Sequence, residues 1–190
     1  MHDLQTRLES IIRTCPRLMQ VLETARRIDL PDWMIFSGAI YQPVWNHLTG
    51  RPLDHGVKDY DLGYFDTDTS YEAEDFIIRR VAASFGEPLS SMVEVRNQAR
   101  VHLWFESRFG EPYSPLRCTA EALTRFTSPA FAVGVRLEQD GSMTIAAPFG
   151  LEDMFAMHIR PNPRRGSSSF ARIAASATRR WPEVRVQQDA

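Results

Sequence analysis

The sequence has few cysteines and almost no lysine. Cys15 and Cys118 are its two cysteines among 190 residues, and their separation fits neither a disulfide framework nor a structural zinc site. We therefore expect free thiols and a reducing compartment, the cytoplasm. Lys58 is the one lysine. The positive charge is otherwise arginine, which favours bidentate contacts to phosphate or carboxylate, although a GC-rich genome gives the same bias.

Long apolar runs and a strong excess of either charge are also absent. No stretch approaches the length of a membrane span. The first ten residues are amphipathic and contain acids, unlike a signal or transit peptide. The formal net charge is −2, whereas general electrostatic binding to nucleic acid needs many uncompensated Lys and Arg residues. We expect neither a membrane nor nucleic acid in general as a partner.

The sequence alternates between helical and strand patterns. Apolar residues recur at helical spacing over residues 3–28, with a break at Pro16. An apolar run over residues 33–36 ends in a turn of small residues, Ser37-Gly38-Ala39, where the backbone can approach a ligand closely. A second helical pattern follows and ends near Gly50.

The next predicted strand, residues 59–65, carries two carboxylates. Asp59 and Asp61 are two residues apart, and on a strand this spacing puts both side chains on one face. Neighbouring carboxylates repel unless a cation lies between them, and such hard oxygen ligands suit Mg²⁺ or Mn²⁺. Mg²⁺ completes its shell with water and substrate phosphates, so a triphosphate is the natural third component. Alternatively, each aspartate is a turn residue bonded to its own backbone.

A further carboxylate is expected on the third strand, residues 92–95. Ser70 is predicted to cap a helix over residues 71–85 that precedes this strand. Glu94 lies between two valines, so its side chain points to the face opposite theirs. Asn97 can cap the helix that continues towards Gly110.

Residues 111–117 contain two prolines and mark a boundary. We divide the chain into a core, residues 1–110, and an extension packed on it, residues 111–190. The extension is predicted to contain a short helix capped by Thr119, a hairpin with its turn at Asp140-Gly141, and helices over residues 151–159 and 169–181.

The order strand, small-residue turn, helix, loop and D-x-D strand resembles the nucleotidyltransferase superfamily that includes DNA polymerase β and the aminoglycoside and lincosamide nucleotidyltransferases. The segments GAIYQPVWN, KDYDLGYFD, NQARVH and APFGLED resemble a group of bacterial nucleotidyltransferase family proteins. The resemblance covers nearly the whole chain. It implies an α/β (α+β) fold: a polymerase β-like core with a short mixed sheet flanked by helices, and a small C-terminal hairpin-plus-helix extension.

The resemblance also implies an activity. A nucleoside monophosphate passes from an NTP to an unknown small-molecule or protein acceptor, and pyrophosphate is released. Asp59, Asp61 and Glu94 are the implied catalytic ligands for Mg²⁺ or Mn²⁺. The superfamily usually has aspartate at the third position, and an exposed glutamate at a sheet edge gives the same sequence pattern.

Ser37, Gly38 and Ala39 are expected to offer backbone N–H groups to the triphosphate. The superfamily usually has Gly-Gly or Gly-Ser where this chain has Gly38-Ala39. The candidate cationic contacts are Lys58, Arg100 and Arg164. Lys58 can equally offset the charge of the aspartates, and Arg164 can belong to a solvated arginine cluster.

Two other functional classes stay open. One is a catalytically weak nucleotide-binding module with the same fold, which would bind a metal-bound nucleotide without releasing pyrophosphate. The other is an antitoxin-like interaction protein, which would form a stable complex with another protein. A fold alone does not decide among these classes.

Overall fold

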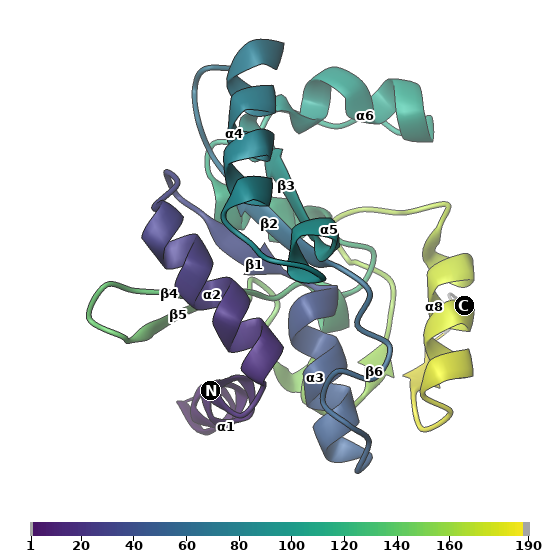
Figure 1. Cartoon of the computed structure of the whole chain (residues 1–190). Coiled ribbons are helices and arrows are strands. Elements are labelled where there is room, and N and C mark those ends of the chain that lie inside the picture. Colours follow the sequence, from purple (N-terminus) through teal and green to yellow (C-terminus); the bar gives the residue numbers. More distant parts are fainter. Residues whose placement is uncertain (1, 188–190) are drawn as a thin grey trace.

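The computed structural model describes residues 2–187, which form a five-stranded mixed sheet flanked by helices (Figure 1). The strand order is β3-β2-β1-β4-β5. β2 and β3 are parallel, whereas β1 runs antiparallel to both β2 and β4, and β4 runs antiparallel to β5. The expected mixed sheet is confirmed. The strands are β1 (Met34–Phe36), β2 (Tyr60–Tyr64), β3 (Val93–Asn97), β4 (Gly134–Leu137) and β5 (Met143–Ala146).

Helices connect and cover these strands. The α-helices are α1 (His2–Arg13), α2 (Pro16–Ile28), α3 (Gly38–Leu48), α4 (Tyr71–Ala83), α5 (Leu89–Met92), α6 (Val101–Phe109), α7 (Glu152–Phe155) and α8 (Phe170–Arg180). Three 3₁₀ helices, η1 (Gln98–Arg100), η2 (Thr119–Arg125) and η3 (Pro129–Phe131), and a small parallel sheet of β6 (His158–Ile159) and β7 (Arg185–Val186) complete the fold. No helix of the described residues is long and apolar enough to cross a membrane.

Local sequence signals account for several element ends. Pro16 occupies the first turn of α2, where its missing N–H is not needed. The Ser70 hydroxyl accepts a hydrogen bond of 3.3 Å from the backbone N–H of Ala73 and caps α4, as expected. The Asn97 side chain likewise accepts from the N–H of Ala99 at 3.0 Å and ends β3.

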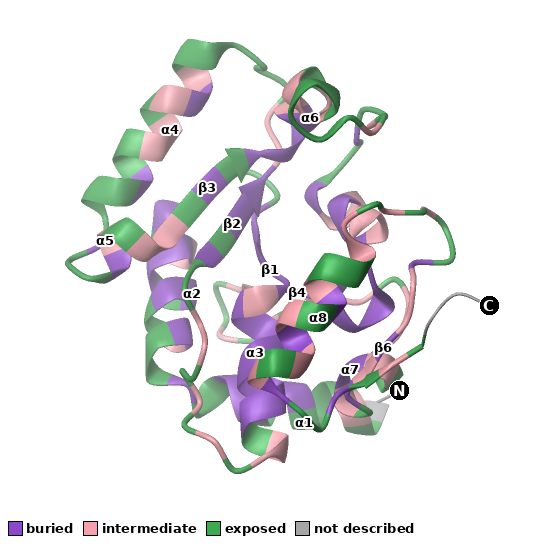
Figure 2. Cartoon of the chain, turned by 90° about the vertical axis from the view of Figure 1, so that its right-hand side faces the viewer, coloured by how far each residue is buried: buried purple, intermediate pink, exposed green. Residues whose placement is uncertain are grey.

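One face of the sheet holds the main hydrophobic core. Ile35, Leu62 and Val95 lie in register on β1, β2 and β3, so their side chains share this face. All three are buried in one cluster with apolar side chains of α1, α2, α3 and α4. Figure 2 shows this buried band between the sheet and its helices. The helices are therefore held to the sheet by this face.

An aromatic cluster joins α3 to the C-terminal helix. The rings of Trp45 and Trp181 are 5.3 Å apart, and both side chains are fully buried. The Trp181 indole N–H donates to the Asn46 side chain at 2.8 Å, and that of Trp45 donates to the Met154 carbonyl at 2.8 Å. These bonds tie α8 and α7 to α3.

The C-terminal hairpin is part of the central sheet. β4 pairs with β1, and β5 completes the edge. The hairpin turn contains Asp140 and Gly141, as the sequence predicts. The division of the chain at residue 110 stays a prediction.

Two local expectations are wrong. Thr119 is the first residue of η2 and does not cap it. Cys118 occupies the cap position, and no side chain makes a capping hydrogen bond there. The helix expected over residues 151–159 ends at Phe155. Met157 then adopts a positive φ of 50°, which changes the direction of the chain. His158 and Ile159 form strand β6 instead of the last turn of the expected helix.

Candidate active site

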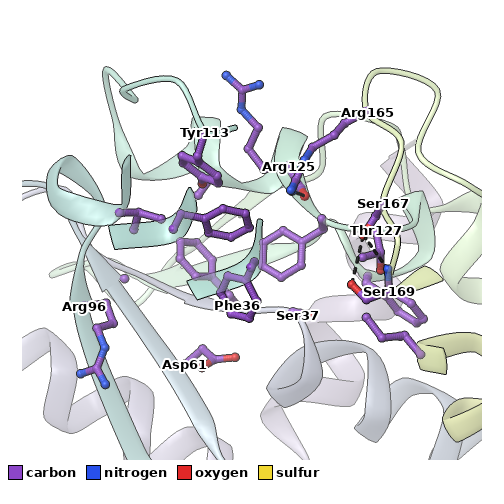
Figure 3. Close-up of a pocket in the computed structure, with 18 of the residues that line it drawn as sticks. Phe36, Ser37, Asp61, Arg96, Tyr113, Arg125, Thr127, Arg165, Ser167 and Ser169 are labelled. Atoms are coloured by element: carbon purple, nitrogen blue, oxygen red, sulfur yellow. Dashed lines mark hydrogen bonds between the residues drawn. The ribbon is translucent and has the colours of Figure 1, made fainter. Parts of the chain in front are cut away.

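The opposite face of the sheet is covered only in part. Met34 and Phe36 of β1 pack there in a smaller cluster with Leu123 of η2 and its neighbours. The β2–β3 half of this face borders a cavity of about 610 Å³, a size within the usual range for small-molecule sites. Figure 3 shows Asp61 and Ser37 on one side of this cavity and Arg125 and Arg165 on the other.

Asp61 and Glu94 lie opposite each other on the floor of the cavity. They are register partners in the parallel pairing of β2 with β3, and both side chains are exposed. Neighbouring strands are about 4.8 Å apart, so register partners are nearest neighbours across the ladder. The expectation that Glu94 shares a face with Asp61 agrees with this geometry.

Asp61 is an unusual carboxylate. Solvent reaches its side chain, but the surrounding walls displace much of the water and raise the pKa to about 6 from 3.8. The negative charges of Asp59 and Glu94 raise this pKa further, and Arg96 acts in the opposite direction. Within the protein alone, Arg96 therefore does not fully compensate the negative charge of ionised Asp61.

Asp59 lies at the entrance to β2 rather than on it, because the strand begins at Tyr60. Its side chain is exposed and does not line the cavity. Its charge nevertheless raises the pKa of Asp61, and it also raises the pKa of Tyr41, a residue of the cavity wall. Asp59 therefore stands beside the carboxylate pair, at the edge of the site.

Phe36 forms the floor beside the carboxylates, and two glycines make room for its ring. A Cβ at Gly63 would lie 2.2 Å from the Phe36 ring, and one at Gly134 would lie 3.1 Å from it. The ring therefore lies across β2 and β4, over positions without side chains. Any side chain at Gly63 would displace the ring.

The small-residue turn forms the start of α3, next to the floor. Ser37 has φ 49° and ψ −106°, an uncommon conformation for a residue with a side chain, and lines the cavity. Its N–H is already bound to the Val133 carbonyl at 2.8 Å. Among the described residues, Gly38 and Ala39 have no backbone acceptor for their N–H groups. These two groups are the free donors at this helix N-terminus. Gly38 and Ala39 themselves are not among the residues that line the cavity.

The structure places Lys58, Arg100 and Arg164 outside the cavity lining. Lys58 is exposed just before β2. Arg100 pairs with Glu74 at 3.2 Å, and Arg164 lies over the Phe149 ring at 5.0 Å from its centre. Their roles as triphosphate contacts stay predictions.

The cavity is also lined by residues that the sequence did not identify as part of this site. Arg96 follows Glu94 on β3 at two-residue spacing, and this alternation was the available signal. Arg125 comes from η2, Arg165 from the loop between β6 and α8, and Arg172 from α8. Another part of the wall is aromatic and comes mainly from α6: Trp104, Phe105, Phe109 and Tyr113.

The acidic residues suit a divalent cation shared with a substrate. Among the described residues, no three histidine, cysteine or acidic side chains gather closely enough to enclose a metal ion by themselves. Mg²⁺ commonly takes only one or two protein carboxylates and receives its other ligands from water and phosphates. Asp61 and Glu94 provide such a pair. Burial first, and then the charges of Asp59 and Glu94, raise the pKa of Asp61, and a cation between the two carboxylates would favour its ionised form against both effects.

Comparison with known proteins agrees with this architecture. An NMR structure whose title describes a CCA-adding enzyme head domain aligns with a TM-score of 0.76 and 22% sequence identity, over 97% of this chain and 96% of that one. At this identity the likeness shows the fold. No curated protein matches the sequence. A family model described as Nucleotidyltransferase matches residues 23–186, from α2 to β7. The chain therefore belongs to the nucleotidyltransferase family.

Proposed function

We propose that the protein transfers a nucleoside monophosphate from an NTP to a hydroxyl or phosphate of an acceptor and releases pyrophosphate. The observation that carries the proposal is the pairing of Asp61 with Glu94 on the floor of a cavity that Ser37, directly before α3, also lines. Family membership supplies the reaction class.

The carboxylates hold the divalent cation in this proposal. Asp61 and Glu94 are its ligands, and Asp59 adds negative charge at the edge of the site. A bound Mg²⁺ or Mn²⁺ neutralises charge on the attacking and leaving oxygens of an in-line displacement. The protein's own task is to hold the two carboxylates at fixed positions on adjacent strands, so that little reorganisation is needed.

The start of α3 holds the triphosphate. Gly38 and Ala39 donate their N–H groups to phosphate oxygens, and the positive end of the helix dipole favours the same anion. Ser37 lines the cavity and its hydroxyl makes no capping bond, so it is available to the same phosphates. The backbone contacts do not depend on a side chain at Ala39.

The acceptor is a small molecule or a protein. The structural neighbour is described as a CCA-adding enzyme domain, and a polynucleotide acceptor usually needs a basic surface. This chain carries a net charge of −2. We therefore favour a compact acceptor that fits the cavity over an RNA acceptor.

Thermal unfolding tests nucleotide and metal binding. Wild type is melted with ATP, CTP, GTP or UTP, each with and without Mg²⁺ or Mn²⁺. A ligand at one hundred times its Kd adds about 2.7 kcal/mol, which moves Tm by a few degrees. We expect a metal-dependent shift with at least one NTP in wild type and none in Asp61→Asn/Glu94→Gln.

A matched variant controls for the loss of an acidic side chain. Glu106 is exposed on α6 and does not line the cavity, so Glu106→Gln should keep the full shift. A shift that survives in the Asp61/Glu94 variant would show that these carboxylates do not hold the metal. A shift without pyrophosphate release on any acceptor would favour a nucleotide-binding module instead.

A further inference from the structure

Helix α6 carries an aromatic face that the hydrophobic core does not use. Trp104, Phe105 and Phe109 belong to neither hydrophobic cluster of the described residues, yet all three line the cavity. Val101 is the one buried residue of the helix, and Phe109 is 52% exposed. Figures 1 and 2 show α6 extending from the end of β3, away from the layer of helices on the other face.

The three rings and Tyr113 form one surface, which we call the aromatic wall. Phe105 is the centre of this wall, because its ring lies 4.7 Å from that of Phe109, 4.5 Å from that of Tyr113 and 6.1 Å from that of Trp104. Such tilted contacts stiffen the rings against one another. The wall is therefore a preformed apolar surface.

Arginines border the aromatic wall. The Arg165 guanidinium lies 5.0 Å from the Phe105 ring centre and is held by Glu111 and by the backbone carbonyl of Arg125. Arg125 lies 5.7 Å from the centre of the Tyr113 ring, and its buried Nε has no hydrogen-bond partner. Arg172 of α8 lines the same cavity and forms no ion pair within the described residues. Positive charge is thus available next to the rings.

Aromatic surface left open in this way suggests a ligand. Contiguous exposed apolar surface is uncommon on a soluble protein unless something covers it, and small-molecule sites combine apolar walls with a few placed polar groups. The aromatic wall shares its cavity with Asp61 and Glu94. A molecule that reaches those carboxylates therefore lies against or near these rings, which favours a substrate over a separate protein partner.

We propose that the aromatic wall binds the planar ring of one of the two substrates, with an anionic part of that substrate near Arg125 and Arg172. The ring belongs either to the base of the NTP or to an aromatic acceptor. This inference rests on the proposed function for the identity of these two substrates, but the binding of a ring requires no turnover. The two proposals can therefore fail separately.

Trp104 provides a direct reporter. Trp33, Trp45 and Trp181 are at most 1% exposed, whereas Trp104 is partly exposed in the cavity. Acrylamide should therefore quench the fluorescence of Trp104 before that of the others. The Trp104→Phe variant supplies the background from the three buried tryptophans.

The experiment measures protection of Trp104 from acrylamide in the presence of Mg²⁺. The probes are the four NTPs, inorganic tripolyphosphate and 1-anilinonaphthalene-8-sulfonate, a planar ring with an anionic group. Protection by an NTP but not by tripolyphosphate assigns the ring to the base. Protection by the naphthalene probe but by no NTP assigns it to the acceptor. Asp61→Asn/Glu94→Gln should keep the naphthalene protection, because it leaves the aromatic wall intact.

A second variant tests the binding energy. Phe105→Ala removes the central ring, and the probe that protects Trp104 should bind about tenfold more weakly, as expected for the loss of one stacking partner. Phe76→Ala is the matched control, because Phe76 is 65% exposed on α4 and lies outside the cavity lining. It should leave the affinity unchanged.

Two results would overturn the proposal. One is that acrylamide quenches Trp104 equally well with and without every probe in a folded protein, which would show that the aromatic wall binds none of these rings. Protection that appears without any probe and grows with protein concentration would instead assign the wall to contact between two copies of the chain.

Discussion

The two faces of the central sheet differ in how their apolar residues are covered. On one face Ile35, Leu62 and Val95 are buried beneath helices. On the other, β2 and β3 present Asp61 and Glu94 to a cavity whose far wall is aromatic. Side chains alternate along these short strands, so successive residues of the same strands serve opposite faces.

The comparison separates stability from chemistry. Burial of apolar area is the main favourable term in folding, and it is concentrated on the helix-covered face. The cavity face carries groups that are unfavourable for the folded chain alone, namely repelling carboxylates and open aromatic rings. Substitutions on the first face should therefore cost folding free energy, whereas those on the second should alter binding more than folding.

The largest expected effect lies on the covered side. Trp45 is fully buried and its indole N–H donates to the Met154 carbonyl. Trp45→Ala leaves a cavity and an unpaired carbonyl, and we expect a loss of about 3–5 kcal/mol of unfolding free energy. Urea unfolding measures it. A loss below about 1 kcal/mol would show that this cluster does not anchor the fold.

A smaller loss is expected at the floor between the two faces. In Gly63→Ala the new methyl group overlaps the Phe36 ring, so the ring must move, at a cost of about 1–3 kcal/mol. Gly86→Ala is the control, because nothing lies within 4 Å of a Cβ built there. Equal Tm values for the two variants would mean that Phe36 does not lie across Gly63.

A gain in stability is expected from Asp61→Asn. The pKa of Asp61 is about 6 when folded and 3.8 when unperturbed, so the folded state disfavours the ionised form. This destabilisation is absent below pH 3.8, grows as pH rises and is complete above pH 6. Without metal, the variant should be more stable than wild type at pH 7.5 by about 1 kcal/mol, because solvent screens the full effect.

Urea titrations at pH 3.5 and 7.5 measure this difference. Near pH 3.5 the two proteins should have nearly equal stability, because Asp61 is mostly protonated in both states of the wild type. Glu106→Gln should follow wild type at both values. An Asp61→Asn variant that is less stable at pH 7.5 would show that the carboxylate is compensated within the folded chain.

The smallest stability effect is expected on the aromatic wall. Trp104 belongs to neither hydrophobic cluster, so Trp104→Ala should cost less than about 1 kcal/mol, far below the usual cost of removing a buried tryptophan. Its Tm should stay close to that of wild type. A loss as large as that of Trp45→Ala would mean that α6 is part of the folding core.

The sequence predicts the parts of the site that local periodicity determines. The two-residue alternation on β3 separates Glu94 from its flanking valines, and Ser70 and Asn97 identify element ends. The small residues of 37–39 indicate the turn before α3. They do not indicate that Ser37, rather than Gly38, takes the positive φ. The Ser37 N–H bonds to the Val133 carbonyl, a partner far away in the sequence that no local pattern reveals.

Long-range packing determines the rest. The register of β2 on β3 makes Asp61 and Glu94 neighbours, and no local pattern specifies the register of two separated strands. The aromatic residues of α6 have the same apolar pattern as a core helix, so sequence alone cannot distinguish a core face from a cavity face. Arginine is common throughout the chain, which hides Arg125, Arg165 and Arg172 until the fold brings them together.

Nucleotidyl transfer itself is tested most directly by following the two ends of an NTP. The protein is incubated with Mn²⁺, a clarified bacterial extract as the source of acceptors, and the NTP that stabilises it, labelled at either the α- or the γ-phosphate. We predict that the α-label moves to an acceptor and the γ-label leaves in pyrophosphate, in wild type and Glu106→Gln but not in Asp61→Asn/Glu94→Gln. Transfer of the γ-label, or equal transfer of the α-label by the Asp61/Glu94 variant, would contradict the account.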